Sequence, residues 1–254
     1  MLIVERQQKV LQMLRHRKTA QLEDIARELE VSASTIRRDL EALEEQNLVK
    51  RTHGGAIYTG PEPSLGGAVA LAERMNEAVD AKLAIGAVAA KLVQPHMTIL
   101  LDGGSSVIYA ARQITARPIQ VVTSSLGIAN LFADDDQVEL LLIGGNLYPR
   151  TGVTIGPIAT GTLAELHADL LLFSLAGIFG HDAFNVNLAM AQVEQVMMQQ
   201  AAQSVLLMDA TKFGRKSLAR VCNLDEIDQI ITDPAIAPAW RERLGDRLLV
   251  APSP

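Results

Sequence analysis

The sequence contains one cysteine, Cys222, among 254 residues. A single thiol excludes an internal disulfide framework and is typical of a protein from a reducing cytoplasm. The five histidines are scattered, so neither they nor Cys222 have the spacing of a metal site. We therefore expect a cytoplasmic protein without disulfide, metal or cofactor.

Long apolar runs are also missing. None approaches the roughly 18 residues that a membrane span requires, and the longest, LLLFSLAGIFGH, is typical of a buried strand and its exit loop. The start, MLIVERQQK, has charged residues before any apolar core, so we expect no signal peptide. Neither a fixed-period repeat nor a low-complexity tract is visible. These absences argue against membrane, secreted and repeat proteins.

The residues that are present indicate a well-buried globular chain, with 48% apolar and 20% charged residues. A net charge of −6 argues against nucleic-acid binding, but the charge is unevenly distributed. Residues 1–58 hold 10 Lys+Arg and 9 Asp+Glu, whereas residues 59–254 hold 13 and 20. This difference is modest. The positions of the charges on the predicted helices are more informative.

Residues 1–58 predict three helices in quick succession. The first covers residues 4–15, the second covers residues 21–30, and the third opens at Ser32, a favourable N-cap. Apolar residues recur at helical spacing on one face of the second and third helices. These residues are Leu22, Ile25, Ala26, Leu29, Ile36, Leu40 and Leu43. Only the residues EVS separate the two helices, which is typical of a helix-turn-helix.

The third helix has hydroxyl and guanidinium groups on its outer face. When its apolar residues face inward, Ser34 and Arg38 point outward, and Thr35 and Arg37 lie beside them. A recognition helix enters the major groove of DNA by its N-terminal end, and an arginine there reads guanine with about 1–3 kcal/mol of discrimination. We therefore predict that these four residues contact DNA.

The segment LVKRTHGGAIY alternates apolar and polar residues around Gly54-Gly55, the signal for a two-residue hairpin turn. Lys50, Arg51 and His53 then lie on a β-wing that reaches phosphate or the minor groove. The alternative is a solvated helix followed by an ordinary basic turn, which an isolated Arg-Arg pair would favour. Helix spacing, capping, outward arginines and a basic wing together favour a winged helix-turn-helix.

The stretch STIRRDLEALEEQNLVKRTHGGA resembles the N-terminal signature of the DeoR/GlpR-type bacterial sugar-operon repressors. One departure is Asn47, where that family commonly has glycine, and asparagine tolerates the same helix-end geometry. The resemblance implies a DNA-contacting surface of Ser34, Thr35, Arg37, Arg38, Arg51 and His53.

Residues 59–68, TGPEPSLGGA, read as a linker, and residues 69–254 alternate helices with short apolar strands. The strand candidates are MTILLD (97–102), IQVVT (119–123), VELLLIG (138–144), LLLFSLA (170–176), SVLLMD (204–209), QIITD (229–233) and RLLVA (247–251). Continuous apolar strands separated by helices predict a doubly wound, mostly parallel α/β sheet. The predicted fold is thus a small winged helix-turn-helix domain at 1–58 and a larger α/β effector domain at 69–254.

Several predicted strands end in loops suited to an anion, and ligands of such sheets bind at the carboxyl ends of the strands. A Gly-Gly-Ser turn is by itself more often plain strand-to-helix chemistry, but several such loops converge on one rim, with Lys212 as the cation. This convergence favours a phosphorylated or anionic polyol ligand. The candidate ligand residues are Asp102, Gly103, Gly104, Ser105, Ser106, Thr123, Ser124, Ser125, Gly145 and Lys212.

The resemblance extends over this half of the chain, because DGGSS, VVTSS, IGG and DATKFG look like the effector domain of the same family. That domain is similar in fold to ribose-5-phosphate isomerase and binds phosphosugars without turning them over. The resemblance implies that Asp102 holds sugar hydroxyls and that residues 103–106 cradle phosphate. Lys82 falls where the family usually has a lysine.

The segment HDAFNVNLAMAQVEQVMMQQAA, residues 181–202, departs from the family pattern. It has no lysine, and Glu194 lies about where one is expected, while His181, Asp182, Asn185 and Asn187 replace the usual loop chemistry. One interpretation is drift on a solvent-facing helix. The other is an altered effector, less charged or differently shaped than in most relatives.

These observations predict a transcriptional repressor of a carbohydrate-utilisation operon. As a homodimer or homotetramer it would bind double-stranded operator DNA, and a phosphorylated sugar would shift it to a weak-binding arrangement. The alternative is a sugar-phosphate isomerase with an appended DNA-binding module. Such an enzyme needs a base and a cation, for which Glu194, Asp209 and Lys212 are the candidates.

Overall fold

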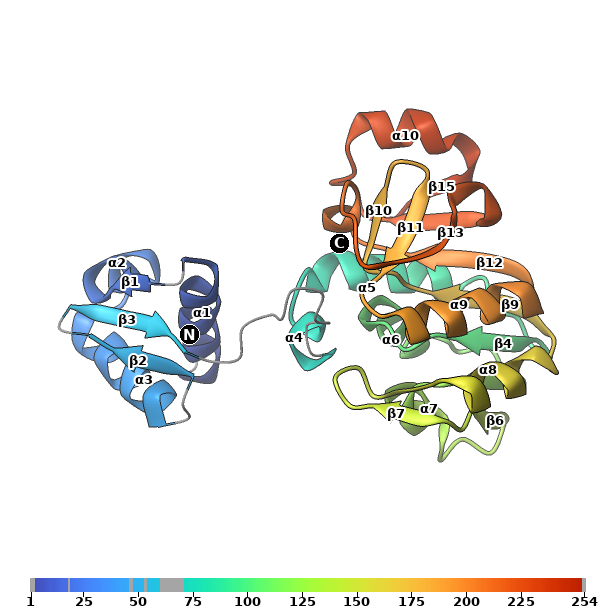
Figure 1. The fold of residues 1–254 in the computed structure, drawn as a ribbon, viewed down its shortest axis with the longest axis horizontal. Coiled ribbons are helices and arrows are strands. Elements are labelled where there is room, and N and C mark those ends of the chain that lie inside the picture. The colour runs from blue at the N-terminus through green and yellow to red at the C-terminus, as the bar shows by residue number, and fades with distance from the viewer. Residues whose placement is uncertain (1–2, 18, 46–47, 53, 60–70, 253–254) are drawn as a thin grey trace. The chain divides into compact units, whose positions relative to one another are not determined.

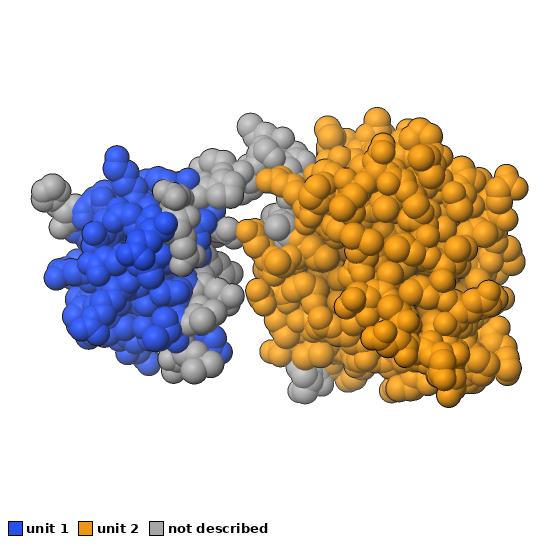
Figure 2. Space-filling model, turned by 90° about the horizontal axis from the view of Figure 1, so that it is seen from below, with its two compact units in different colours: residues 1–64 blue, residues 65–254 orange. Residues whose placement is uncertain are grey.

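The computed structural model describes residues 3–17, 19–45, 48–52, 54–59 and 71–252. The chain divides into two compact units, residues 1–64 and residues 65–254 (Figure 2). Each unit contains hydrophobic core residues of its own. Of the predicted linker 59–68, only Thr59 lies within the described residues.

The N-terminal unit is a winged helix-turn-helix, as predicted. Its helices are α1 (Ile3–Arg17), α2 (Leu22–Glu28) and α3 (Ala33–Glu45). Its antiparallel sheet has the order β1-β3-β2, formed by β1 (Thr19–Gln21), β2 (Val49–Arg51) and β3 (Gly55–Tyr58). The predicted apolar faces are buried together, with Ile25, Ile36, Leu40 and Leu43 at most 2% exposed. This core fixes α3 with its opposite face toward solvent.

The wing differs from the prediction at Gly55, which is the first residue of β3 and not a turn residue. Gly55 pairs with Gln21 of β1, a third strand that the sequence did not predict. A Cβ at Gly55 would overlap the Ala20 carbonyl, so glycine is required for the close approach of β1. The hairpin itself is present, with the Thr52 N–H donating to the Gly55 carbonyl over 2.9 Å.

The C-terminal unit is built on a seven-stranded parallel sheet of order β15-β14-β12-β9-β4-β5-β6. All seven predicted strands are in this sheet. They are β4 (Thr98–Leu101), β5 (Ile119–Thr123), β6 (Val138–Leu142), β9 (Ala168–Phe173), β12 (Ala201–Leu207), β14 (Gln229–Thr232) and β15 (Leu248–Val250). The α/β fold class is therefore confirmed.

Helices cover both faces of this sheet (Figure 1). On one face lie α5 (Val79–Ala90), α6 (Ser105–Ala111) and α7 (Leu126–Phe132), and on the other lie α8 (Pro157–Ala164) and α9 (Leu188–Gln200). Successive strand residues alternate between the two cores, as Leu170 and Leu172 join the first and Leu171 and Phe173 the second. Both faces are apolar, which explains the continuous apolar runs of the sequence.

Several short elements were not predicted. A second, antiparallel sheet has the order β10-β11-β13, from Gly177–Phe179, Asp182–Asn185 and Ala219–Asn223. A separate hairpin joins β7 (Asn146–Tyr148) to β8 (Val153–Ile155). The remaining unpredicted elements are the helices α4 (Leu71–Met75) and α10 (Pro238–Leu244) and the 3-10 turns η1 (Ala210–Lys212), η2 (Leu224–Glu226) and η3 (Gly245–Arg247). Several of these elements border the cavity described below.

Candidate DNA-binding surface and effector cavity

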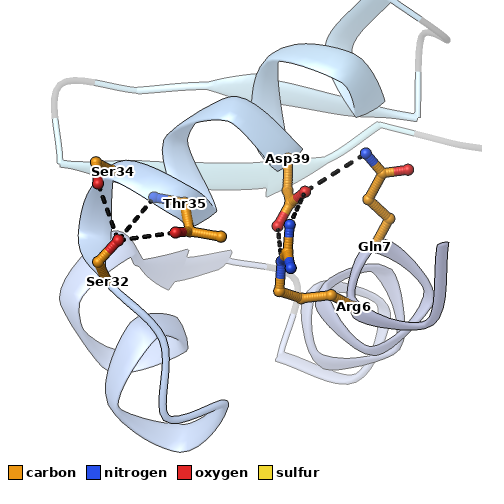
Figure 3. A network of polar contacts seen from close by, with 6 residues as sticks. All are labelled: Arg6, Gln7, Ser32, Ser34, Thr35 and Asp39. Atoms are coloured by element: carbon orange, nitrogen blue, oxygen red, sulfur yellow. Dashed lines mark hydrogen bonds and ion pairs between the residues drawn. The ribbon is translucent and has the colours of Figure 1, made fainter. Parts of the chain in front are cut away.

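The N-terminal end of α3 carries a cluster of hydroxyl groups (Figure 3). Ser32 caps the helix, because its Oγ accepts the Thr35 N–H over 3.2 Å. The same Oγ lies 2.9 Å from Ser34 Oγ and 2.8 Å from Thr35 Oγ1. Ser34 is exposed and Thr35 is half-buried. These contacts hold the hydroxyls at the end of the helix that enters a DNA groove in helix-turn-helix proteins.

Arg37 and Arg38 are both exposed on α3, as the helix projection predicted. Neither forms an ion pair with any residue that the structure describes. Exposed, unpaired guanidinium groups remain free to bind phosphate or guanine. Their contact with DNA remains a prediction.

The wing residues differ in how they are held. Lys50 is exposed, whereas Arg51 donates to Glu41 Oε1 and Glu44 Oε2 of α3, each over 2.7 Å. The hydrogen bonds from Arg51, first that of its backbone N–H, lower the pKa of Glu44. Arg51 therefore ties the wing to α3, and His53 lies outside the described residues.

Asp39 is a structural residue of this unit that the sequence reasoning missed (Figure 3). It is 2% exposed, and its carboxylate accepts from Arg6 of α1 over 2.5 Å and 3.1 Å and from Gln7 over 3.5 Å. The hydrogen bond to Asp39 raises the pKa of Arg6. The charge pair thus joins α1 to α3, and a signal for it existed, because position 39 lies on the face defined by Ile36, Leu40 and Leu43.

A cavity of about 190 Å³ lies in the C-terminal unit, where β4 and β9 end. We call it the sensor cavity. Of the predicted ligand residues, Asp102, Gly103, Gly104 and Lys212 line it. Asn185 and Glu194, from the segment for which an altered effector was one of two interpretations, also line it. The sequence did not predict the other lining residues, which are Arg74, Thr151, Ser174, Leu175, Ala176, Val186, Met190, Arg215, Lys216 and Ser217.

The turn after β4 can be formed only by small residues. A Cβ on Gly103 would overlap the Val153 side chain, and a Cβ on Gly104 would overlap the Ser174 hydroxyl. The Ser174 N–H donates to Asp102 Oδ2 over 3.2 Å, which holds the carboxyl at the cavity wall. Glycine at both positions thus leaves room beside Asp102.

Burial shifts the pKa values of the charged groups that line the sensor cavity. It raises the pKa of Asp102, against the opposing effects of the Gly103 and Ser174 backbone N–H groups and of Arg74. It raises the pKa of Glu194 well above its usual range, and the Asp102 charge adds to this rise. Burial also lowers the pKa values of Lys212 and Arg74. The cavity therefore places acids and cations together where water screens them poorly.

Three polar atoms of this cavity lack a hydrogen-bond partner. They are Arg74 Nε, Thr151 Oγ1 and Glu194 Oε2, and the fourth such buried atom in the described part of the chain, Thr232 Oγ1, belongs to β14. Most buried polar groups in proteins are hydrogen-bonded. Unpartnered groups concentrated in one cavity are what a polar ligand would satisfy.

Four further predicted ligand residues follow the first two strands and are buried within the protein. Ser105 and Ser106 are buried at the start of α6. Thr123 Oγ1 donates to the Leu101 carbonyl over 2.7 Å, and Ser125 Oγ caps α7 at the Ile128 N–H over 3.3 Å. None of these four lines the sensor cavity, and their part in ligand binding remains a prediction.

Ser124, Gly145 and Lys82 also lie outside the cavity lining. The Ser124 carbonyl accepts the Thr154 N–H over 2.8 Å, and Gly145 has a left-handed φ of 144°. Lys82 is 2% exposed, and its Nζ donates to the carbonyls of Arg74 and Glu77. Lys82 thereby fixes the end of α4, which carries Arg74 into the cavity.

Glu194 is 1% exposed, so the interpretation of this position as drift on a solvent-facing helix is wrong. Asn185, at the end of β11, donates from its amide to Glu194 Oε1. Asn187 caps α9, Asp182 pairs with Arg220 over 2.7 Å, and His181 is exposed. The unusual segment thus supplies two cavity residues, Asn185 and Glu194, and the start of the helix that carries one of them.

The described residues contain no cluster of three His, Cys, Asp or Glu side chains that could hold a metal ion. Their helices include none with the length and apolar character needed to cross a membrane.

Comparison with known proteins assigns both units. The DeoR-like helix-turn-helix domain matches residues 6–62, and the DeoR C terminal sensor domain matches residues 77–234. A helix-turn-helix domain with a sensor domain defines a DNA-binding transcription regulator. The chain belongs to the DeoR family of such regulators.

Similar proteins match over most of their length. The chain is 34% identical to the L-fucose operon activator of Escherichia coli (strain K12), over 90% of this chain and 94% of that protein. It is 32% identical to the HTH-type transcriptional repressor GlcR of Bacillus subtilis (strain 168), over 90% and 88%. It is 30% identical to the HTH-type transcriptional regulator GolR of Listeria innocua serovar 6a, over 95% of each.

Solved structures resemble parts of the fold. Ribose 5-phosphate isomerase A of Methanocaldococcus jannaschii matches at 18% identity over 52% of this chain and 53% of that chain, with a TM-score of 0.37. The eIF2B delta subunit of Chaetomium thermophilum matches at 14% identity over 78% and 62%, with a TM-score of 0.45. The family is one of regulators, not enzymes, and Asp209, one of three candidate catalytic residues, does not line the cavity. The isomerase alternative therefore has no support.

Proposed function

We propose that the protein represses a carbohydrate-utilisation operon in the cytoplasm and leaves its operator when a phosphorylated sugar fills the sensor cavity. The observation that carries this proposal is the cavity itself. Its lining includes four cationic side chains, Arg74, Lys212, Arg215 and Lys216, and polar atoms without partners. A phosphate is a dianion or nearly so at neutral pH, and sugar hydroxyls are donors and acceptors.

The DNA-binding half of the proposal rests on α3 and the wing. The exposed Ser34, Arg37 and Arg38 would read the major groove, with Thr35 beside them. Lys50 and His53 would contact the DNA backbone, while Arg51 would hold the wing against α3 through Glu41 and Glu44. Two-fold operators pair half-sites about one helical turn apart, so we propose a homodimer or homotetramer.

The named relatives support a sugar operon as the target, since one is an L-fucose operon activator and another is a putative aga operon transcriptional repressor. They include both activators and repressors. The experiment below therefore tests the direction of the ligand effect, and tighter operator binding with a sugar phosphate would contradict the proposed release.

The experiment is a fluorescence-anisotropy titration of a promoter fragment from the protein's own operon, at physiological salt, with random DNA as competitor. We expect specific binding that is at least about a thousandfold tighter than random binding, and release by a sugar phosphate but not by the unphosphorylated sugar. Equal affinity for both DNAs would contradict the DNA half. Insensitivity to every sugar phosphate would contradict the sensor half.

A variant of one cavity cation tests the ligand site directly. The bound ligand raises the melting temperature by mass action, so K212M should lose most of the shift that a sugar phosphate gives the unaltered protein. The control is K91M, because Lys91 is an exposed lysine of the same unit outside the cavity. Equal shifts in the two variants would remove Lys212 from the site.

A further inference from the structure

Two buried carboxyl groups line the sensor cavity together, Asp102 after β4 and Glu194 on α9. They are close enough for the Asp102 charge to raise the pKa of Glu194. A binding site for phosphate alone has no need of two acids, because each repels the anion. Their presence indicates that the ligand carries a second group, one that carboxylates attract and do not repel.

Glu194 presents one oxygen to the cavity without a partner. The orientation of the Asn185 side-chain amide is fixed, because its Oδ1 accepts the Val186 N–H over 2.6 Å. Its amide nitrogen must then face Glu194. Glu194 Oε1 accepts that amide, whereas Oε2 has no hydrogen-bond partner. In the ionised form of Glu194, which a bound cation would favour, Oε2 is therefore an acceptor for a donor on the ligand.

A hydroxyl and an ammonium group are both donors, but they differ in charge. Burying an ionised carboxylate is costly unless an opposite charge accompanies it. Arg74 is the cation whose charge acts on both acids, and burial lowers its own pKa. An ammonium beside Asp102 and Glu194 would offset both carboxylates, whereas a hydroxyl would leave their mutual repulsion in place.

The cations suited to a phosphate come from one segment. Lys212 ends η1, Arg215 and Lys216 follow it before β13, and all three line the cavity. With Asp102 and Glu194 ionised, the four cationic and two acidic lining residues leave a net charge of +2. The net charge alone suits a phosphate, whereas the two neighbouring acids suit an ammonium group on the same ligand.

We propose that the sensor cavity selects an amino-sugar phosphate, whose ammonium donates to Glu194 Oε2 beside Asp102 while Lys212, Arg215 and Lys216 hold the phosphate. This inference rests on the proposed function, since it specifies the ligand of the same sensor site.

The experiment compares matched ligands on the unaltered full-length protein by isothermal titration calorimetry. In each of the gluco, galacto and manno series, the hexose 6-phosphate, the 2-amino-2-deoxyhexose 6-phosphate and its N-acetyl derivative are titrated. We expect the amine to bind at least about tenfold tighter than both others in at least one series. The hexose 6-phosphate has a neutral hydroxyl in place of the ammonium group. The N-acetyl derivative keeps the nitrogen but not its positive charge.

The variant E194Q replaces the free acceptor with an amide that can present a donor to the ligand. It should reduce the preference for the amine to less than about threefold while the hexose 6-phosphate still binds. The control E165Q makes the same chemical change at an exposed position outside the cavity and should leave the preference unchanged. The comparison on the unaltered protein stands even if E194Q does not fold.

The outcomes separate the two proposals. If sugar phosphates bind but the amine has no advantage in any series, the amino-sugar inference is overturned and the proposed function stands. If E194Q keeps the full preference, Glu194 is not the ammonium acceptor and the inference is overturned. If none of the nine compounds binds, the amino-sugar inference is overturned, and the operator-release titration decides the proposed function separately.

Discussion

The two units of the protein treat buried charge in opposite ways. In the DNA-binding unit, the buried Asp39 is fully engaged by Arg6 and Gln7, and the unpaired cations, Arg37 and Arg38, are exposed. In the sensor unit, the buried Glu194 has an oxygen without a partner. A buried acid is thus fully hydrogen-bonded in one unit and only partly hydrogen-bonded in the other.

This difference has a physical cause. A buried polar group without a partner costs about 1–3 kcal/mol, so such groups persist where a ligand supplies the missing bond. A cation in water costs little to leave unpaired and can exchange its counterions for DNA phosphates. We therefore expect unpaired groups to mark the functional surfaces of both units, although they are exposed in one and buried in the other.

The largest effect is expected from D39A, which removes the acceptor of the hydrogen bonds from Arg6 and Gln7 and frees α1 from α3. We expect the melting temperature of the DNA-binding unit to fall by roughly 5 °C or more, with loss of operator binding in parallel. Calorimetry of the full chain measures this. The matched control is D24A, since Asp24 pairs with Arg27 at an exposed site. Equal melting temperatures of D39A and D24A would show that Asp39 does not hold α1 against α3.

R38A should have the next largest effect, and on DNA alone. Loss of an arginine that reads guanine should weaken specific operator binding roughly tenfold to a hundredfold and weaken random-DNA binding much less. Competition titrations at one salt concentration give the ratio of the two affinities. R112A, which changes an exposed arginine of the sensor unit, should change neither. An unchanged ratio in R38A would exclude Arg38 from base reading.

Much of the fold followed from the sequence because it depends on local pattern. Strands such as β5 and β9 have continuous apolar runs, since helices cover both faces of the sheet, and α3 has a clear apolar face. The short strands β10 and β11 have no such run. They form a local hairpin, and β11 also pairs with β13, which is distant in sequence. They were therefore missed.

The candidate site was predicted only where it depends on strand ends. Asp102, Gly103 and Gly104 follow β4 directly, and so they were found. For Glu194 the sequence left two interpretations open, a solvent-facing helix and an altered effector site, because a charged residue within a helix is usually exposed. The burial of Asp39 was not predicted for the same reason. In both cases the neighbours carried the signal, since Met190 and Met197 lie four residues before and three after Glu194 and are buried with it.

E194Q should change the free energy of unfolding by less than D39A does, and the size of this change should depend on pH. Burial raises the pKa of Glu194 in the folded state above its unfolded value, so the folded state keeps a proton that the unfolded state releases. The stability of the unaltered protein therefore declines as pH rises from about 4.3, the pKa of an unfolded glutamate, and stops declining above the folded pKa. Glutamine does not ionise, so E194Q lacks this decline.

We therefore expect the stability of E194Q relative to the unaltered protein to increase between pH 4 and pH 8, measured by urea unfolding without ligand. E165Q serves as the exposed control and should show no such trend. A variant that is both more stable at neutral pH and impaired in ligand selection would show that Glu194 is kept for binding. If E194Q instead lost stability relative to the unaltered protein as pH rises, burial would not raise the pKa of Glu194 in the folded state.

The smallest effect is expected from R51A, which separates a paired cation from an unpaired one on the same wing. Arg51 already binds Glu41 and Glu44, whereas Lys50 forms no ion pair in the described part of the chain. Removing one cation that binds a DNA phosphate makes the slope of log affinity against log salt shallower by about one. K50A should show that reduction, while R51A should keep the slope and change affinity less than about threefold. A slope reduced as much in R51A as in K50A would mean that Arg51 leaves its carboxylates for phosphate, and that the distinction between paired and unpaired charges fails on the wing.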